Sequence, residues 1–139
     1  MKNPITGSCL CGTVQFEVTK PFLGFWYCHC ERCQRSTGSA HAANIFMKPE
    51  QFRWIAGKEN ITLFIHKQAD DYPRAFCKTC GSPVPRFARD GVRWVVQAGL
   101  LENDPDIRPT DNIFWPLHAA WYENPEHLPK HEARPVKKT

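Results

Sequence analysis

The chain has 139 residues, 42% of them hydrophobic, and a net charge of +4. This length and composition suit one folded domain with a real core and exclude wholesale disorder. No apolar run approaches the ~18 residues that span a bilayer, and the basic residues form no stripe of the kind that nucleic acid binds, so neither membrane nor nucleic acid is an expected partner.

The predicted elements are short strands separated by turn residues. Alternating apolar and polar residues, or β-branched and aromatic runs, predict strands at 13–18, 25–27, 42–47, 52–55, 61–65 and 92–98. Prolines restrict 84–88 to an edge strand, and 113–120 is a last extended piece. Residues 31–37 predict one helical turn closed by Gly38, whereas 1–8 and 101–112 are expected to be turn and loop.

No stretch has a sustained helical period, so the fold class predicted is mainly β with a few short helical turns. We expect a single domain over 1–139 with its core at about 5–130, and a loosely ordered C-terminal tail over 124–139. The five tryptophans are expected to fill the β interior, since aromatic bulk is usually buried there.

The seven cysteines fall into three groups, a pair, a triplet and a second pair: Cys9 and Cys11; Cys28, Cys30 and Cys33; Cys77 and Cys80. The N-terminus lacks the apolar core of a signal peptide, which predicts a cytoplasmic, reducing location where disulfides rarely persist. Seven is also an odd number for a disulfide scaffold. The pattern therefore favours metal ligation.

The two pairs can supply four thiolates to one closed structural zinc site: Cys9, Cys11, Cys77 and Cys80. Gly12 and Gly81 directly follow the pairs, and glycine lets the backbone turn tightly and direct N–H groups at the sulfurs. The spacing leaves the connectivity open, because any four of the seven cysteines could share an ion.

Cys28, Cys30 and Cys33 can hold a second zinc ion and leave its fourth position open, as in catalytic zinc sites. A small thiol that enters this position would lose its proton and become a nucleophile. The alternative is a site closed by a fourth protein ligand, for which His29 and His41 are the nearby candidates.

Arginines lie near the cysteine segments, and the planar guanidinium fork suits a carboxylate. Arg35, Arg53 and Arg74 are the candidates to bind an anionic substrate, with Arg32 and Arg86 also close in sequence. Taken singly, each could instead be solvated or paired with an acidic residue.

Four segments resemble the glutathione-dependent formaldehyde-activating (GFA) family: Gly7–Gly12, Cys28–Gly38, Phe52–Trp54 and Arg74–Pro83. The resemblance implies a β-tent fold of small antiparallel sheets around zinc. It implies structural zinc on the two cysteine pairs and a more labile zinc on the triplet. It also implies that formaldehyde and the glutathione thiol combine to S-(hydroxymethyl)glutathione, a carbon–sulfur lyase reaction.

The chain departs from the family pattern near its C-terminus, where Asn112 stands for an expected histidine and His118 for an expected lysine. Two functions are therefore weighed. The first is a zinc enzyme acting on a thiol and an aldehyde. The second is a non-catalytic zinc module that binds a thiol or a protein partner. A redox sensor based on the triplet is a distant third.

Overall fold

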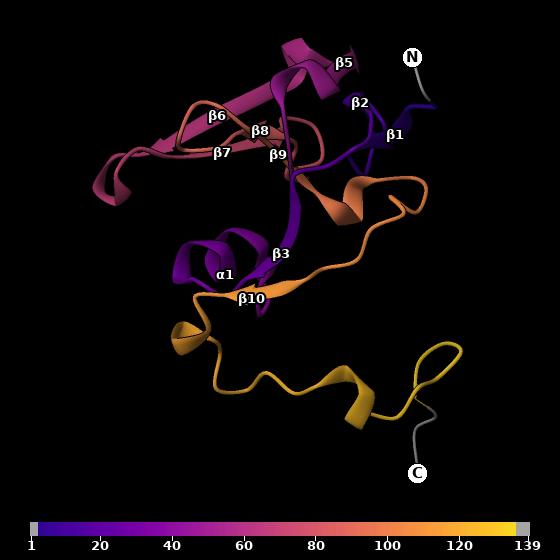
Figure 1. Ribbon diagram of the computed structural model, residues 1–139, viewed down its shortest axis with the longest axis vertical. Helices are drawn as coiled ribbons and strands as arrows, with labels where there is room; N and C mark the ends of the chain where they lie inside the picture. The colour runs from indigo at the N-terminus through magenta and orange to yellow at the C-terminus, as the bar shows by residue number, and fades with distance from the viewer. Residues whose placement is uncertain (1–2, 136–139) are drawn as a thin grey trace.

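The computed structural model describes residues 3–135, so the expected domain of 1–139 extends beyond the described residues at both ends. Within that range the chain forms ten β-strands and one α-helix (Figure 1). The mainly β fold predicted from the sequence is confirmed. The elements are β1 Ile5–Ser8, β2 Gln15–Val18, β3 Gly24–Cys28, α1 Glu31–Thr37, β4 Ala42–Met47, β5 Phe52–Ala56, β6 Ile61–His66, β7 Tyr72–Cys77, β8 Arg86–Phe87, β9 Trp94–Gln97 and β10 Asp111–Ile113.

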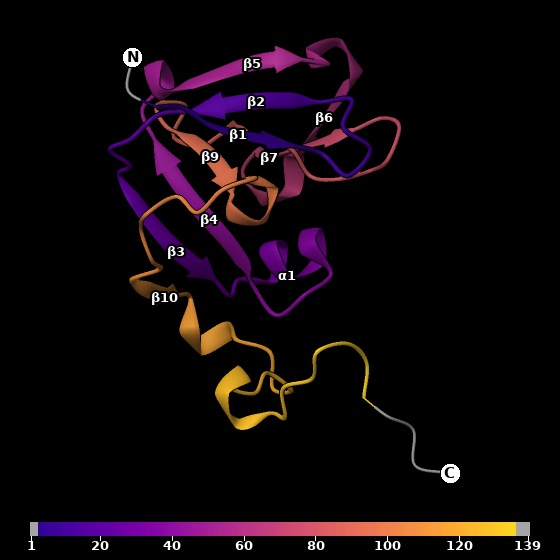
Figure 2. The same ribbon diagram turned by 90° about the vertical axis from the view of Figure 1, so that its right-hand side faces the viewer.

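Two sheets pack on each other around the main core. One has the strand order β1-β2-β5, and the other has the order β10-β3-β4-β9-β8 (Figure 2). Apolar residues of both sheets share this core, in which Phe16 of β2 and Ile45 of β4 are fully buried. Because side chains alternate along a strand, Ile45 and Met47 of β4 face this core, whereas Phe46 between them packs in a smaller cluster with Ala88 and Val95.

One strand pair departs from the expected antiparallel pattern. Strand β10 runs parallel to β3, with Ile113 opposite Cys28, whereas the other pairs are antiparallel. Two parallel strands need a long connection. The connection between β3 and β10 contains every element from α1 to the 3₁₀ turn at Ala98–Leu100. The pairing holds the chain after residue 110 beside the cysteine triplet (Figure 1).

Strands β6 and β7 form a separate two-stranded hairpin, in which Ile61 pairs with Cys77 and His66 pairs with Tyr72. Strand β7 thus begins at Tyr72 and ends at a cysteine of the last pair. Phe64 and Phe76 are exposed on this hairpin.

Several predicted boundaries are corrected by the structure. Residues 5–8 form strand β1 rather than a turn, and β2 begins at Gln15 rather than Thr13 because Val14 is hydrogen-bonded to Cys9. The last strand is β10, Asp111–Ile113. It therefore begins inside the segment predicted as a loop, 101–112, and ends at the first residue of the piece predicted to be extended, 113–120. The chain leaves the strand at Phe114, whose φ is +56°, and a 3₁₀ turn covers Trp115–Leu117.

The chain after β10 runs away from the two sheets (Figures 1 and 2). Trp115 and Trp121 are 44% and 69% exposed, so the expectation that all five tryptophans lie in the core is wrong for these two. The remaining turns are 3₁₀ helices, at Pro49–Gln51, Lys58–Asn60, Lys67–Ala69, Ala98–Leu100 and Pro125–His127. Within 3–135, none of the helices has the length and apolar character to cross a membrane.

Candidate functional site

Four cysteines from distant parts of the sequence meet beside the end of β7, and we call them the first cluster: Cys9, Cys11, Cys77 and Cys80. Their sulfurs all lie within 4.8 Å of one another, with 3.7 Å between Cys9 and Cys11 and 3.9 Å between Cys11 and Cys77. Thiolates placed tetrahedrally about 2.3 Å from zinc lie about 3.8 Å apart, whereas a disulfide needs about 2.05 Å. The donor set therefore fits a zinc ion.

Two glycine turns fix the spacing of the first cluster. Gly12 and Gly81 have φ of +81° and +76°, a left-handed backbone that glycine adopts without strain. The Gly12 N–H donates to the Cys9 carbonyl at 3.1 Å, and the Gly81 N–H donates to the Cys77 carbonyl at 2.8 Å. These bonds close each pair into a tight turn, as expected from the sequence.

Burial raises the pKa of Cys9 in the first cluster, whereas hydrogen bonds from neighbouring backbone and side-chain groups favour the thiolate forms. The Val14 N–H donates to Cys9 Sγ at 3.3 Å, and the Asn60 amide donates to Cys77 Sγ at 3.4 Å. The Ser82 hydroxyl, 3.3 Å from Cys80 Sγ, acts with the backbone N–H groups of Ser82 and Cys11 to lower the pKa of Cys80 to about 5. Donors of this kind orient sulfur ligands and stabilise their charge.

The remaining three cysteines, which we call the second cluster, lie where β3 meets α1: Cys28, Cys30 and Cys33. Cys28 ends the strand, Cys30 is the N-cap of the helix, and Cys33 lies in its first turn. The Cys33 N–H donates to Cys30 Sγ at 3.4 Å, the contact expected of an N-cap side chain. All three are buried, and their sulfurs lie within 4.8 Å of one another.

Hydrogen bonds among the three buried thiols shift the pKa values of Cys28 and Cys30 in opposite directions. Hydrogen bonds from Cys28 and Cys33 lower the pKa of Cys30, and the same bonding to Cys30 and Cys33 raises the pKa of Cys28. A cation that binds all three sulfurs must therefore displace protons, which makes its affinity depend on pH. This donor set also fits zinc, with three protein ligands.

His29 lies between two of these cysteines, and its side chain points away from them, as the sequence indicated. Its ring is fully buried, with Nε2 2.9 Å from Asn112 Oδ1 and the rings of His41 and Trp115 at 5.0 Å. Among residues 3–135, neither His29 nor His41 joins the group of side chains that could hold a metal at the second cluster.

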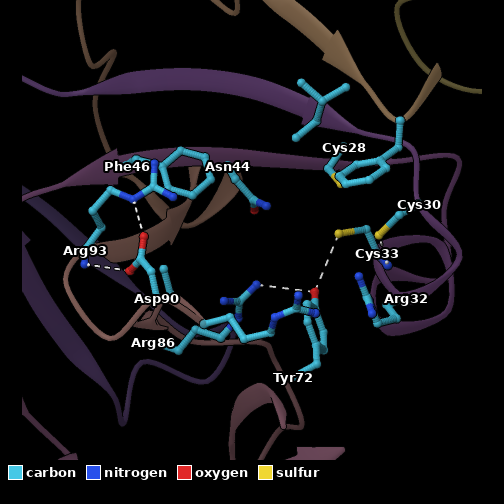
Figure 3. Close-up of a pocket in the computed structure, with 14 residues that line it drawn as sticks. Cys28, Cys30, Arg32, Cys33, Asn44, Phe46, Tyr72, Arg86, Asp90 and Arg93 are labelled. Atoms are coloured by element: carbon cyan, nitrogen blue, oxygen red, sulfur yellow. Dashed lines mark hydrogen bonds and ion pairs between the residues drawn. The ribbon is translucent and has the colours of Figure 1, made fainter. Parts of the chain in front are cut away.

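The second cluster forms one end of a cavity of about 440 Å³. In Figure 3, the three cysteines lie at one end, Asp90 and Arg93 lie at the other, and Tyr72 and Arg86 lie between them. The cavity is large enough for a small organic molecule. The first cluster does not line it.

Tyr72 connects the second cluster to two arginines. Its hydroxyl lies 3.5 Å from Cys33 Sγ and accepts a hydrogen bond of 3.3 Å from Arg86. The guanidinium carbons of Arg32 and Arg86 lie 5.1 and 5.2 Å from the Tyr72 ring centroid, within the range of cation–π contact. Burial lowers the pKa of Arg86 and raises that of Tyr72.

The arginines proposed from the sequence are not those that line the cavity. Arg53 is paired with the buried carboxylate of Glu17, between β5 and β2. Arg35 and Arg74 line two other surface hollows, and Ser36 and Phe64 line both of these. The cavity itself presents four arginines, of which sequence reasoning noted the first two without choosing them: Arg32, Arg86, Arg89 and Arg93.

Small β-sheets with two cysteine clusters, each able to hold a metal ion, define a mainly β metal-binding protein. The family model described as glutathione-dependent formaldehyde-activating enzyme matches residues 4–116. The chain belongs to this family, as the resemblance of its cysteine motifs indicated.

A solved structure shares the fold. The crystal structure of a Rhodobacter sphaeroides protein matches with a TM-score of 0.60 and 28% sequence identity, over 77% of this chain and 98% of that chain. No curated protein matches the chain. The fold and the family are thus shown by independent comparisons.

The two departures from the family pattern lie outside the cysteine cavity. Asn112 and His118 line a different hollow of about 470 Å³, together with Tyr27, Trp115 and Tyr122. Asn112 is bonded to His29, and the His118 ring stacks on Trp115 with centroids 4.0 Å apart.

Proposed function

We propose that this chain is a zinc-dependent carbon–sulfur lyase that joins a small anionic thiol, of the glutathione type, to an aldehyde such as formaldehyde, or cleaves the adduct in reverse. One observation carries the proposal. In the part of the chain that the structure describes, residues 3–135, three buried cysteines with no fourth protein ligand beside them form the wall of a cavity, whereas four cysteines form a cluster outside it. This is the difference between catalytic and structural zinc sites.

We assign the first cluster to the structural ion and the second cluster to the ion at the active site. A zinc ion on Cys28, Cys30 and Cys33 would have one coordination position left for the substrate sulfur and would favour its deprotonated form. The arginines of the cavity offset the negative charge of the thiolates and of the substrate.

The bond changes are those of thiol addition to a carbonyl. The substrate sulfur donates an electron pair to the aldehyde carbon, the carbon–oxygen π bond opens, and the oxygen takes up a proton from water. The reverse reaction breaks the carbon–sulfur bond and returns the aldehyde. The cavity residues bind and orient the thiol, and Tyr72 holds Cys33 in place through its hydroxyl.

The experiment is an exchange measurement by NMR with ¹³C-formaldehyde, glutathione and the zinc-loaded protein. Catalysis predicts faster exchange between free formaldehyde and the hydroxymethyl adduct than in the absence of protein. Cys28→Ser should abolish this acceleration while leaving the fold intact. Exchange at the uncatalysed rate, with zinc bound at both clusters, would argue against the enzyme.

The second candidate is a non-catalytic zinc module that binds a thiol or a protein partner. The departures at Asn112 and His118 favour it, if these positions serve catalysis. Both side chains line a hollow separate from the cysteine cavity, which weakens that argument. Thiol binding without acceleration of exchange would identify this module.

A further inference from the structure

Strand β6 has a free outer edge in the part of the chain that the structure describes. Its strand partner there is β7, and the hairpin of the two strands extends away from the β1-β2-β5 sheet (Figure 1). The outer side of β7 is occupied, because the Val84 N–H donates to the Ala75 carbonyl at 3.0 Å and the Cys77 N–H donates to the Ser82 carbonyl at 2.9 Å. The hairpin is therefore a two-stranded sheet with one open edge, and an open edge is a template for a further strand.

The register of the hairpin shows which backbone groups of β6 face outward. The Lys78 N–H donates to the Asn60 carbonyl at 2.9 Å, so the even-numbered residues of β6 bond to β7. The bonding direction alternates along an antiparallel strand. The N–H and C=O groups of Ile61, Leu63 and Ile65 therefore face the open edge.

This edge lacks the features that usually prevent strands from pairing with other chains, namely charged residues, proline or a very short strand. Strand β6 has six residues, none of them Lys, Arg, Asp, Glu or Pro, and Leu63 and Phe64 at its centre are 60% and 53% exposed. The other edge strands described between residues 3 and 135 are protected. Strands β8 and β10 have two and three residues, β5 contains Arg53, and β1 is bonded to the chain at 101–102.

We propose that the open edge of β6 pairs antiparallel with the same edge of a second copy of this chain. The two hairpins then form one sheet with the strand order β7-β6-β6-β7. When Leu63 lies opposite Leu63 of the second copy, Ile61 lies opposite Ile65 at both ends, and the outward groups form about six backbone hydrogen bonds. Because each copy offers one such edge, the two-fold axis closes the assembly at a dimer.

The charges that flank β6 favour a second copy as the partner. Glu59 lies two residues before Ile61, and Lys67 lies two residues after Ile65. The same register places Glu59 of each copy opposite Lys67 of the other, so a pair of opposite charges stands at both ends of the apolar ladder. Lys67 also lies 3.4 Å from Asp71, but both side chains are exposed, and such a pair is too weak to hold Lys67 back.

The test is sedimentation equilibrium of the zinc-loaded full chain from about 1 to about 100 µM. We expect the average mass to approach twice the 16.0 kDa of one chain as the concentration rises. Leu63→Lys places two like charges opposite each other at the two-fold axis, so this variant should keep the mass of one chain throughout. Leu128→Lys, a matched change at a residue 51% exposed outside the hairpin, should dimerise like the natural chain.

Charge reversal tests the register. Glu59→Lys or Lys67→Glu alone places like charges opposite each other at both ends of the ladder, and each should weaken the dimer about 5- to 30-fold. The two changes together restore opposite charges and should restore dimerisation. Because Glu59 and Lys67 are both exposed, these variants decide the question if Leu63→Lys does not fold.

A natural chain that stays monomeric at about 100 µM would overturn the proposal. A dimer that Leu63→Lys leaves intact would also overturn it, because the interface would then lie elsewhere. A double reversal that dimerises no better than the single ones would contradict the antiparallel register. Strand β6 contributes no residue to the cysteine cavity, so zinc content should be natural in every folded variant, and none of these outcomes depends on the proposed function.

Discussion

Tyr72 and Cys77 are the first and last residues of strand β7, and they connect this strand to the two different cysteine clusters. The Tyr72 hydroxyl contacts Cys33 of the second cluster, and Cys77 is a member of the first. A strand of this length spans about 17–20 Å. The first cluster thus lies at one end of the strand whose other end borders the candidate active site.

The role of Tyr72 can be tested with Tyr72→Phe, which removes the hydroxyl and keeps the ring between the arginines. The variant loses the contact to Cys33 Sγ and the hydrogen bond from Arg86. Loss of a hydrogen bond to a metal ligand typically lowers metal affinity about 10- to 100-fold. We expect zinc at the second cluster to weaken by about tenfold in competition with a chelator, while zinc at the first cluster is unchanged. Equal weakening of both ions would show a general loss of stability instead.

Cysteine substitutions in the two clusters should have different effects. Cys9→Ser removes a ligand that joins the β1–β2 turn to the end of β7, and structural zinc contributes roughly 10–16 kcal/mol of apparent binding energy in small domains. We expect loss of cooperative thermal unfolding or a large drop in Tm. Cys28→Ser should lose one zinc per chain with little change in the circular dichroism spectrum. Loss of folding in Cys28→Ser, with only zinc loss in Cys9→Ser, would show that the second cluster is structural and that the first is not.

Acid should release the two ions in order. Each cluster contains a thiol of raised pKa and one of lowered pKa, Cys28 and Cys30 in the second cluster and Cys9 and Cys80 in the first, so these shifts do not order the ions. The number of ligands does, because the second cluster offers three sulfurs and the first offers four, and we expect the ion with fewer protein ligands to leave first. Protons compete with zinc for thiolates, by about tenfold in affinity per pH unit for each proton taken up. A chelating dye should therefore detect one zinc per chain before the other during acid titration, and Cys28→Ser should lack the first step. A single simultaneous release in the natural chain would contradict this order.

Phe114 has a left-handed backbone and also lines the cysteine cavity. A non-glycine residue in this conformation costs of order 1–3 kcal/mol, and such strain is often found at functional sites. Phe114→Gly relieves the strain, whereas Phe114→Ala keeps it and loses the same ring. We expect the free energy of unfolding of the glycine variant to exceed that of the alanine variant by roughly 1 kcal/mol. The glycine variant should therefore have the higher Tm. Both should bind thiols more weakly, and equal Tm values would show that the conformation stores no strain.

Arg53 should matter for stability and not for substrate. Its guanidinium pairs with Glu17, whose side chain is 9% exposed, while Arg53 itself is 67% exposed. Removing the Arg53 charge leaves the buried Glu17 carboxylate unpaired. Because solvent screens this pair, we expect the free energy of unfolding to fall by about 1–2 kcal/mol. Urea unfolding of Arg53→Gln should show this loss, with glutathione binding unchanged. Weaker glutathione binding in a variant of natural stability would restore Arg53 to the substrate site.

The sequence predicted the parts of the fold that depend on local patterns. Helix α1 and strand β4 have the predicted bounds, because Gly38 and Pro49 mark where each must end. The cysteine spacing predicted the local pairs and the triplet, since adjacent ligands share a tight turn. It favoured one shared cluster for the two distant pairs but left the connectivity open, and the structure brings these pairs together. The mainly β class followed from short runs separated by turn residues.

The parts that sequence reasoning missed depend on packing between distant segments. Gly7 hides strand β1, because it carries no side chain to mark the alternation, and a Cβ there would lie 2.3 Å from the Phe16 ring. Arg86 was not chosen for the cavity because only the pairing of β8 with β9 and the path of β7 bring it next to Tyr72. The prolines near Arg86 predicted only an edge strand at 84–88, and an edge strand gives no reason to expect a buried side chain.

The central claim is that the second cluster holds a zinc ion with a place for a thiol. Zinc X-ray absorption on the fully loaded chain, before and after addition of glutathione, tests it most directly. Four sulfurs at one ion and three at the other predict about 3.5 sulfur ligands per zinc on average, rising to about 4 with glutathione. An average that glutathione does not change, or a chain that binds one zinc ion only, would contradict the account.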